Sequence, residues 1–500
     1  MSGIFALPLR RIGLCIIAVV AALSIAWVNQ RPAYADEPPT SLSFPAQATT
    51  ESTTITRPAN SDPQLPFCGL YKKNRVPVAP GNQQPLGATV CEGGTAAGYP
   101  CSNVDLQAFV PLASFGSSEG SSLWGWTDED SGREFALFGA TDGTAFFEIT
   151  NAAVPVYLGK LDSATSDSIW RELKTYADHV FIVSDFNGNH GIQVFDLTQL
   201  LDVQNPPVAF TETANYQGVG SAHTIAIDET AGYAYALGSD DCNGGLHMVD
   251  IRVPAAPVYA GCFASDGYTH DAQCLTYNGP DQDYVGQQLC IASNEDTVTI
   301  VNVTNKANPV QISRTGYAGA GYTHQSWLTP DSNYMVLDDE FDENGVDGSR
   351  TYIWDMRNLD VPTVIDIHEG ATPAIDHNQY TKDGYVFQAN YTAGMRVLDA
   401  TDIANGNLTE VGFFDIYPSS NEAFFAAAWN VFPYFDSGNV IVSGIEQGLF
   451  ILKPTNLTPP TAVEVADFST TAASPNNTMP IAAAFGLLGV LGMGILVRRK

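Results

Sequence analysis

The sequence predicts an all-β fold, a seven-bladed β-propeller made of four-stranded blades. Segments rich in β-branched and aromatic residues recur at a spacing of 46–54 residues, which is typical of propeller blades. Each segment predicts a hairpin, because two such runs flank a turn that contains Gly, Asn or Asp. A run that begins at a proline follows most hairpins and predicts an outer strand, where a missing backbone donor does least harm.

Seven hairpins are expected, and together they define a propeller over residues 108–453. They cover residues 134–150, 179–196, 232–250, 287–303, 333–355, 384–399 and 439–452. The strand before each hairpin is expected to be the innermost strand of its blade. Because propellers commonly close by combining strands from both ends of the chain, residues 103–116 are expected to supply a strand to the ring.

One position on the expected inner strands recurs in all seven blades. It is occupied by Trp124, Trp170, His223, His270, His324, His377 and Trp429. Two of the histidines stand in the repeated stretch Tyr-Thr-His, within YTHDAQC (268–274) and YTHQSW (322–327). Since innermost strands line the central channel, we expect these side chains to converge there.

Three roles are open for the four histidines. They could bind a metal or a polar ligand, with Asp271 and Asp376 as adjacent carboxylates, or take part in catalysis. They could also lock the strands through internal hydrogen bonds, as the recurring histidine of WD-repeat propellers does. The tryptophans could form an apolar wall for sugar rings or aromatic ligands, or belong to the core.

Acidic turns offer a second kind of candidate site. They lie in the same hairpin loop of successive blades, at 184–191, 238–245, 293–296 and 338–348. Crowded oxygen ligands suit Ca²⁺, whereas solvated acidic turns bind nothing. A divalent cation is therefore a possible cofactor, either Ca²⁺ on these loops or a transition metal at the histidines.

Both ends of the chain carry apolar segments. Residues 1–35 are expected to be a secretory signal peptide, because two arginines precede an apolar run that ends in an A-x-A motif. Either general secretory or twin-arginine export fits this pattern. Residues 480–500 hold an uncharged apolar run followed by three basic residues, which predicts a transmembrane anchor with a cytoplasmic end. Residues 36–66 and 454–479 are expected to be a flexible leader and a stalk.

The charge is strongly acidic. Residues 36–480 contain 16 basic and 54 acidic residues, so nucleic acid is not an expected partner. The expected partners are the membrane, through the C-terminal helix, and an extracellular protein, glycan or small molecule. The expected location is the outer face of the cytoplasmic membrane, at the cell surface or in the periplasm.

Cysteines are expected to pair in such an oxidising compartment. Cys274 and Cys290 flank a loop between two strands of one blade, and Cys242 and Cys262 bracket the last two strands of the preceding blade. Both pairs are expected to form disulfides. The N-terminal segment 67–107 contains three more cysteines, Cys68, Cys91 and Cys101, whose pairing stays open.

Several long stretches resemble one bacterial family. They are CEGGTAAGYPCSNVDLQAFVPL (91–112), WGWTDEDSGREFALFGATDGTAFFEITN (124–151), GYTHDAQCLTYNGPD (267–281), SNEDTVTIVNVTNKANPV (293–310) and YIWDMRNLDVP (352–362). Over roughly residues 68–453 the chain resembles the choice-of-anchor B family, whose blades are LVIVD repeats. This resemblance implies a propeller displayed on the cell surface and supplies no catalytic residues.

The sequence favours recognition over catalysis. It has no G-x-S-x-G nucleophile motif, and its glycines lie in expected hairpin turns instead of phosphate-binding loops. We therefore expect a surface-anchored binding module for a ligand or partner that the sequence does not identify. The alternatives are a metal-dependent enzyme with a histidine-lined site at the channel mouth, and a structural protein of the envelope.

Overall fold

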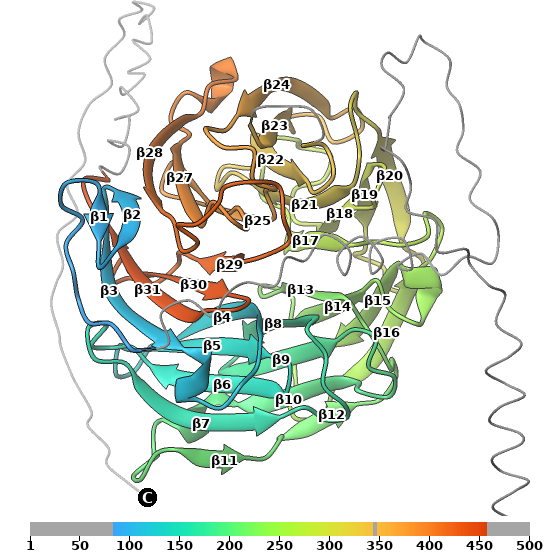
Figure 1. Ribbon diagram of the computed structural model, residues 1–500. Coiled ribbons are helices and arrows are strands. Elements are labelled where there is room, and N and C mark those ends of the chain that lie inside the picture. Colours follow the sequence, from blue (N-terminus) through green and yellow to red (C-terminus); the bar gives the residue numbers. More distant parts are fainter. Residues whose placement is uncertain (1–83, 344–347, 458–500) are drawn as a thin grey trace, which may run out of the picture. The chain divides into compact units, whose positions relative to one another are not determined.

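A computed structural model describes residues 84–343 and 348–457. In these ranges the chain forms seven sheets in a ring, and the four strands of each blade are antiparallel, so the predicted seven-bladed β-propeller is confirmed (Figure 1). The same ranges contain no α-helix, and their only helical turns are short 3-10 segments. These are η1 (Leu112–Ser114), η2 (Leu197–Leu200), η3 (Cys242–Gly244) and η4 (Ile403–Asn405).

The first three blades follow one another along the chain. Blade one consists of β4 (Gly120–Asp128), β5 (Arg133–Ala140), β6 (Gly143–Glu148) and β7 (Val156–Asp162). Blade two consists of β8 (Arg171–Tyr176), β9 (His179–Ser184), β10 (Ile192–Asp196) and β12 (Ala214–Tyr216), while β11 (Val208–Phe210) pairs with β7 of blade one in parallel. Blade three consists of β13 (Thr224–Asp228), β14 (Tyr233–Leu237), β15 (Leu246–Asp250) and β16 (Val258–Phe263).

The next three blades repeat this order. Blade four consists of β17 (Asp271–Thr276), β18 (Gln288–Ser293), β19 (Val298–Asn302) and β20 (Val310–Thr315). Blade five consists of β21 (Thr323–Leu328), β22 (Tyr334–Asp339), β23 (Arg350–Asp355) and β24 (Thr363–Glu369). Blade six consists of β25 (Asn378–Lys382), β26 (Tyr385–Ala389), β27 (Met395–Asp399) and β28 (Thr409–Phe414).

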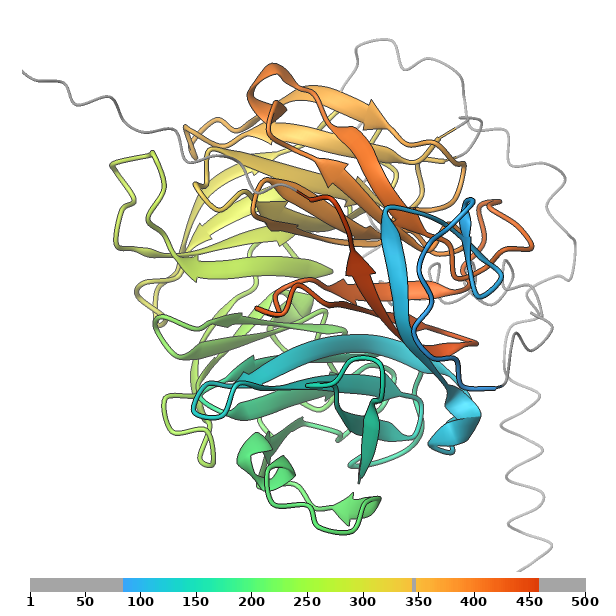
Figure 2. The same cartoon turned by 90° about the vertical axis from the view of Figure 1, so that its left-hand side faces the viewer.

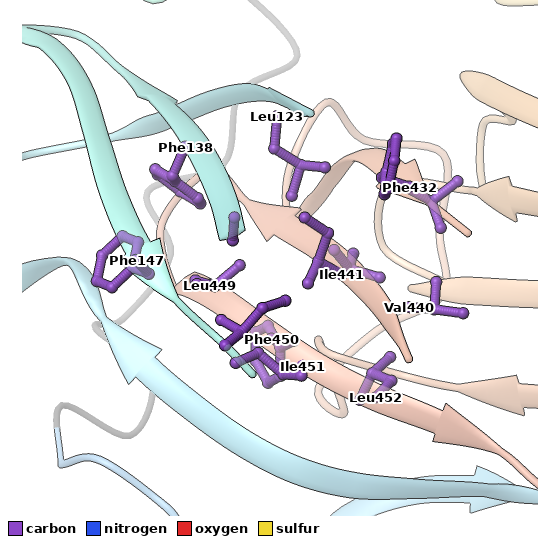
Figure 3. Close-up of a cluster of buried hydrophobic side chains, with 14 of the residues drawn as sticks. Leu123, Phe138, Phe147, Phe432, Val440, Ile441, Leu449, Phe450, Ile451 and Leu452 are labelled. Carbon is purple, nitrogen blue, oxygen red and sulfur yellow. The ribbon is translucent and has the colours of Figure 1, made fainter. Parts of the chain in front are cut away.

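Blade seven closes the ring with strands from both ends of the propeller. It consists of β29 (Ala428–Phe432), β30 (Val440–Gly444), β31 (Gly448–Pro454) and, as its outer strand, β3 (Val104–Pro111). β3 pairs with β31 in antiparallel register, which confirms that residues 103–116 supply a closing strand. Buried side chains of blades one and seven, among them Phe138, Phe147 and Phe450, pack together at this junction (Figure 3).

The outer strands start where the prolines predict. β7, β16, β20 and β24 each begin at the residue after a proline. In blades one, three, four, five and six the register shifts once between the third and fourth strands, which indicates a recurring β-bulge. Such a bulge increases the local twist of the strand that carries it. The twist of the sheets is visible from the side in Figure 2.

The N-terminal segment extends the edge of blade six. β1 (Thr95–Ala96) and β2 (Tyr99–Ser102) form a small hairpin, and β2 pairs with β28. A disulfide joins Cys91 to Cys101 across this hairpin. Two further disulfides join Cys274 to Cys290, which face each other on β17 and β18, and Cys242 to Cys262.

The expected signal peptide (1–35), leader (36–66), most of the stalk (454–479) and the anchor (480–500) lie outside the described residues. The same is true of Cys68. In the part of the chain that the structure describes, no helix is long and apolar enough to cross a membrane.

Candidate functional site

The seven inner strands surround the propeller axis, and a cavity lies at each of their two ends. A small cavity is lined by residues at or just before the first residues of the inner strands. A larger cavity is lined by residues toward the ends of all seven inner strands. The inner strands therefore run from the small cavity to the large one.

Six of the seven recurring positions converge on the small cavity. It is lined by Trp170, His223, His270, His324, His377 and Trp429, together with four neighbouring residues, and it has a volume of about 20 Å³. The centres of successive imidazole rings are 4.5, 4.1 and 4.4 Å apart along the series. A volume of this size holds one water molecule or one ion and excludes an organic ligand.

Trp124 does not join this group, so its expected equivalence with the other six positions is wrong. It lines the larger cavity instead, where its ring packs against Phe432. β4 begins four residues before Trp124, and the register with β5 shifts between Gly120 and Leu123. In the same strand, the hydroxyl of Ser121 bonds the backbone of Arg171, the residue after Trp170.

The Nδ1 atoms of the four histidines hold neighbouring strands together. His270 Nδ1 lies 2.9 Å from the carbonyl oxygen of His324, and His377 Nδ1 lies 2.5 Å from that of Trp429. A carbonyl oxygen can only accept, so Nδ1 carries the proton in both rings. His223 Nδ1 contacts Asp185 at 2.9 Å, and His324 Nδ1 contacts Asp338 at 2.7 Å. Three of these four contacts join neighbouring blades. The histidines therefore lock strands together, which is one of the roles left open by the sequence.

The Nε2 atoms of two of these histidines face a buried carboxylate. Glu340 follows β22 directly, and its side chain is fully buried. Its Oε2 lies 3.9 Å from His324 Nε2, and its Oε1 lies 3.7 Å from His377 Nε2. Tyr391 donates a hydrogen bond of 2.7 Å to Oε1. Neither His324 Nε2 nor Glu340 Oε2 has a hydrogen-bond partner among the described residues.

Burial keeps these groups uncharged. It lowers the pKa of His324 well below its ordinary value, helped by the neighbouring imidazoles, and lowers the pKa of His377 to about 3. Burial also raises the pKa of Glu340 and of Asp338 well above the usual range for carboxyl groups. The neutral imidazoles of His324 and His377 therefore lie beside the carboxyl groups of Glu340 and Asp338. Among the described residues, no cation lies nearby to stabilise the ionised form of these carboxyl groups.

Neither of the two carboxylates expected beside the histidines belongs to the group that His324 and His377 form with Glu340. Asp376 belongs to a separate buried cluster with Asp342 and Glu343, whose ligand oxygens lie within 4.8 Å of one another. Burial raises the pKa of all three groups. Asp271 is the first residue of β17 and lines neither cavity, and burial raises its pKa to about 7, although the charge of Lys174 acts in the opposite direction.

The acidic turns divide into two kinds. Asp240, Asp241 and Asp296, in the turns at 238–245 and 293–296, are exposed, whereas the described carboxylates of the other two turns are buried. Asp185 in the loop after β9 and Asp339 and Glu340 at the end of β22 are all buried. Asp339 accepts hydrogen bonds from Tyr317 and from the backbone of two residues before β21. These carboxylates tie the loops to the inner strands instead of facing solvent.

An apolar cluster packs at the histidine end of the axis. It consists of Trp170, Tyr322, Ile375, Tyr391, Phe425, Trp429 and Ile445, with Ile169 and Phe341 packed against it. Tyr322 contacts the ring of His270, and Trp429 and Tyr391 contact the ring of His377. The cluster therefore separates the imidazoles from bulk water.

The larger cavity has a volume of about 650 Å³ and an aromatic wall. Trp124, Trp327, Phe432 and Tyr434 line it. The first two pack at steep angles against one shared ring, Tyr380, with ring centres 5.5 and 4.8 Å away. Cavities of about 300–1,000 Å³ with apolar walls and a few polar groups are typical of small-ligand sites.

Polar side chains complete the lining of the larger cavity. Lys174 lies over the ring of Trp124 at 4.3 Å and is paired with Glu172 at 2.5 Å. Gln273 accepts a hydrogen bond from the backbone of Leu328, which fixes its amide against β21. Asp228 accepts from the hydroxyl of Thr276 at 3.0 Å. These contacts hold the polar groups in place around the aromatic wall.

The comparisons with known proteins identify no family for this chain. No protein family and no curated protein matches the chain by sequence. Among solved structures, Kuenenia stuttgartiensis hydrazine synthase has 10% identity and a TM-score of 0.45, with 63% of this chain and 91% of that chain covered. A protein from Lactobacillus plantarum has 16% identity and a TM-score of 0.43, with 65% of this chain and 89% of that chain covered. The β-propeller domain of Myceliophteria thermophila Cps50 (Swd1) has 10% identity and a TM-score of 0.41, with 64% of this chain and 93% of that chain covered. Similarities of this size assign no function to the chain.

Proposed function

We propose that this protein is a recognition module that binds a neutral carbohydrate in the larger cavity. The observation that carries the proposal is the combination of a volume of about 650 Å³ with an aromatic wall and fixed polar groups. A sugar ring presents an apolar face and a rim of hydroxyls. Aromatic rings such as Trp327 cover such a face, and side chains such as Gln273 and Thr276 can bond the rim.

The charges around the cavity favour a neutral ligand. Lys174 is compensated by Glu172, so it does not offer a free cation to an acidic sugar. Asp228 and Glu229 also line the cavity, and the chain as a whole has a net charge of −32. An anionic ligand would be repelled by this surface.

Display outside the cytoplasm belongs to the same proposal. Three disulfides staple the described part of the chain, and disulfides persist in oxidising compartments. The N-terminal and C-terminal segments of the sequence have the patterns of a signal peptide and a membrane anchor. The resemblance to choice-of-anchor B proteins accords with a propeller held at the cell surface.

The test is binding of the purified protein to a panel of neutral and acidic glycans, followed by titration with the best binder. Trp327 is partly exposed in the cavity, so Trp327→Ala should weaken binding at least tenfold. Tyr259→Ala is the matched control, because it removes an aromatic ring that is 57% exposed and lies outside the cavity. Equal binding by Trp327→Ala and wild type, or no binding to any neutral glycan, would contradict the proposal.

A further inference from the structure

We propose that His324, His377 and Glu340 bind one divalent first-row transition ion at the narrow end of the propeller axis. The ion would join blades five and six, because His324 lies on β21, Glu340 follows β22, and His377 immediately precedes β25. This site is separate from the carbohydrate cavity at the other end of the inner strands, and neither proposal depends on the other.

The distances fit a shared ion better than direct hydrogen bonds. The two nitrogen–oxygen separations, 3.9 and 3.7 Å, are too long for hydrogen bonds. Two ligand atoms that are each about 2.1 Å from one ion can be separated by up to about 4.2 Å. The three ligand atoms lie within 4.8 Å of one another, so a small contraction of the group brings all of them into range.

The surroundings orient the ligands. The carbonyl oxygen of Trp429 accepts from His377 Nδ1, and the carboxyl group of Asp338 lies 2.7 Å from His324 Nδ1, from which it accepts when it is ionised beside a bound cation. Each bond leaves the Nε2 lone pair directed toward Glu340. Tyr391 fixes Glu340 through its hydroxyl. Imidazole bonded at Nδ1 to a carbonyl or a carboxylate is the usual arrangement of histidine ligands in metal sites.

The chemistry of the donors selects the kind of ion. Two imidazole nitrogens and one carboxylate suit Zn²⁺ and its neighbours in the first transition row, whereas Ca²⁺ and Mg²⁺ take oxygen ligands. A divalent ion would also compensate the buried carboxylates of Glu340 and Asp338. The cavity of about 20 Å³ next to the imidazoles has room for one water molecule as a further ligand. It has no room for an organic substrate, so the inferred role is to hold blades together.

The experiment uses the purified full chain, stripped with a chelator and titrated with Zn²⁺. Elemental analysis should find one tightly held Zn²⁺ per chain, and the melting temperature should rise with added Zn²⁺. Glu340→Gln should lower the affinity at least tenfold while preserving an acceptor for Tyr391. Asp338 contacts His324 but is not itself one of the three ligands, and Asp338→Asn should lower the affinity about 10–100-fold.

The matched control is His247→Gln. His247 is also buried and contacts Asp241 through Nδ1, but its Nε2 contacts Tyr216 at 2.9 Å. The neighbouring Cys242 is held in a disulfide, so this histidine lacks the ligand set of the proposed site. This variant should bind Zn²⁺ like the wild type. X-ray absorption of the loaded wild type should show two imidazole ligands and needs no variant to fold. Equal affinity in Glu340→Gln and wild type, no tightly held Zn²⁺, or a shell of oxygens alone would overturn the proposal. The last result would place the ion at Asp342, Glu343 and Asp376.

Discussion

Asp415 provides a quantitative test of how burial acts on an isolated carboxylate in this fold. It follows β28, is 5% exposed, and its backbone amide bonds the carbonyl oxygen of Pro100 in the N-terminal segment. Burial raises the pKa of Asp415 to about 6, although the backbone amide of Tyr417 and the charge of Arg396 act in the opposite direction. The replacement Asp415→Asn keeps the shape of the side chain and an oxygen that accepts from the backbone amide of Tyr417. It removes the group that titrates.

The sign and size of the effect follow from this pKa. Because the folded-state pKa of about 6 is above the ordinary value of 3.8 for an aspartate, the folded protein holds the proton more tightly than the unfolded chain does. Wild-type stability attributable to Asp415 is therefore present below about pH 4 and is lost as the pH rises to about 6. The slope is about 1.4 kcal/mol per pH unit, and the total is about 3 kcal/mol. Asp415→Asn should accordingly become more stable than wild type, by up to about 3 kcal/mol, between pH 4 and pH 7.

The assay is urea unfolding of wild type and variant, followed by tryptophan fluorescence from pH 3.5 to pH 7.5. The quantity to plot is the difference in the free energy of unfolding between the two proteins, since other titrating groups cancel in it. Asp436→Asn replaces an exposed carboxylate and should give a flat difference. A flat line for Asp415→Asn, or a slope of the opposite sign, would refute the argument that the N-terminal segment and blade six bury this charge.

Three further predictions concern stability. Phe109 on the closing strand β3 is 1% exposed and stacks on Phe450. Phe109→Ala should therefore lower the free energy of unfolding, measured by chemical denaturation, by about 3–5 kcal/mol. Val110→Ala, at a partly exposed position on the same strand, should lower it much less. Replacing both cysteines of the disulfide across β17 and β18 by Ala should remove about 3 kcal/mol, the chain-entropy value for a loop of this length, with the melting temperature as the measurement. Asp185→Ala should cost about 2–4 kcal/mol in the same assay, because it leaves the buried imidazole of His223 and the hydroxyl of Ser221 without their acceptor.

Much of the fold was predictable because a propeller is periodic. Hairpin turns, proline-led outer strands and the spacing of 46–54 residues are local features, and each is repeated often enough to fix the blade number. The closing strand was also predictable, since the C-terminal hairpin alone supplies too few strands for a blade. The position of Trp124 along the propeller axis was not predictable from the sequence, because it depends on the extra residues and the register shift at the start of β4.

The convergence of the histidines was predictable, but their carboxylate partner was not. Glu340 belongs to a run of acidic residues that the sequence places in a turn, and turns of this composition usually face solvent. Its burial depends on how the loop after β22 folds back onto the axis, which involves contacts with Tyr391 of the next blade. The only sequence signal was the density of carboxylates at 338–343, which suggested a cation without identifying the ligands.

The two nitrogens of each imidazole explain why a histidine recurs at this position. Nδ1 reaches a carbonyl or an aspartate and ties adjacent strands, which is sufficient reason for a histidine in a scaffold. Nε2 of His324 and Nε2 of His377 both lie near the buried carboxylate of Glu340. His324 Nε2 has no hydrogen-bond partner among the described residues, and an unbonded buried acceptor costs stability in a scaffold. Strand locking and ion binding are therefore complementary roles of one ring. The apolar cluster packs at that end of the axis, and the larger cavity opens at the other, so a ligand should still bind there after the ion is removed. Glycan affinity that is unchanged by the chelator, together with a lower melting temperature, would show the two roles acting separately in one propeller.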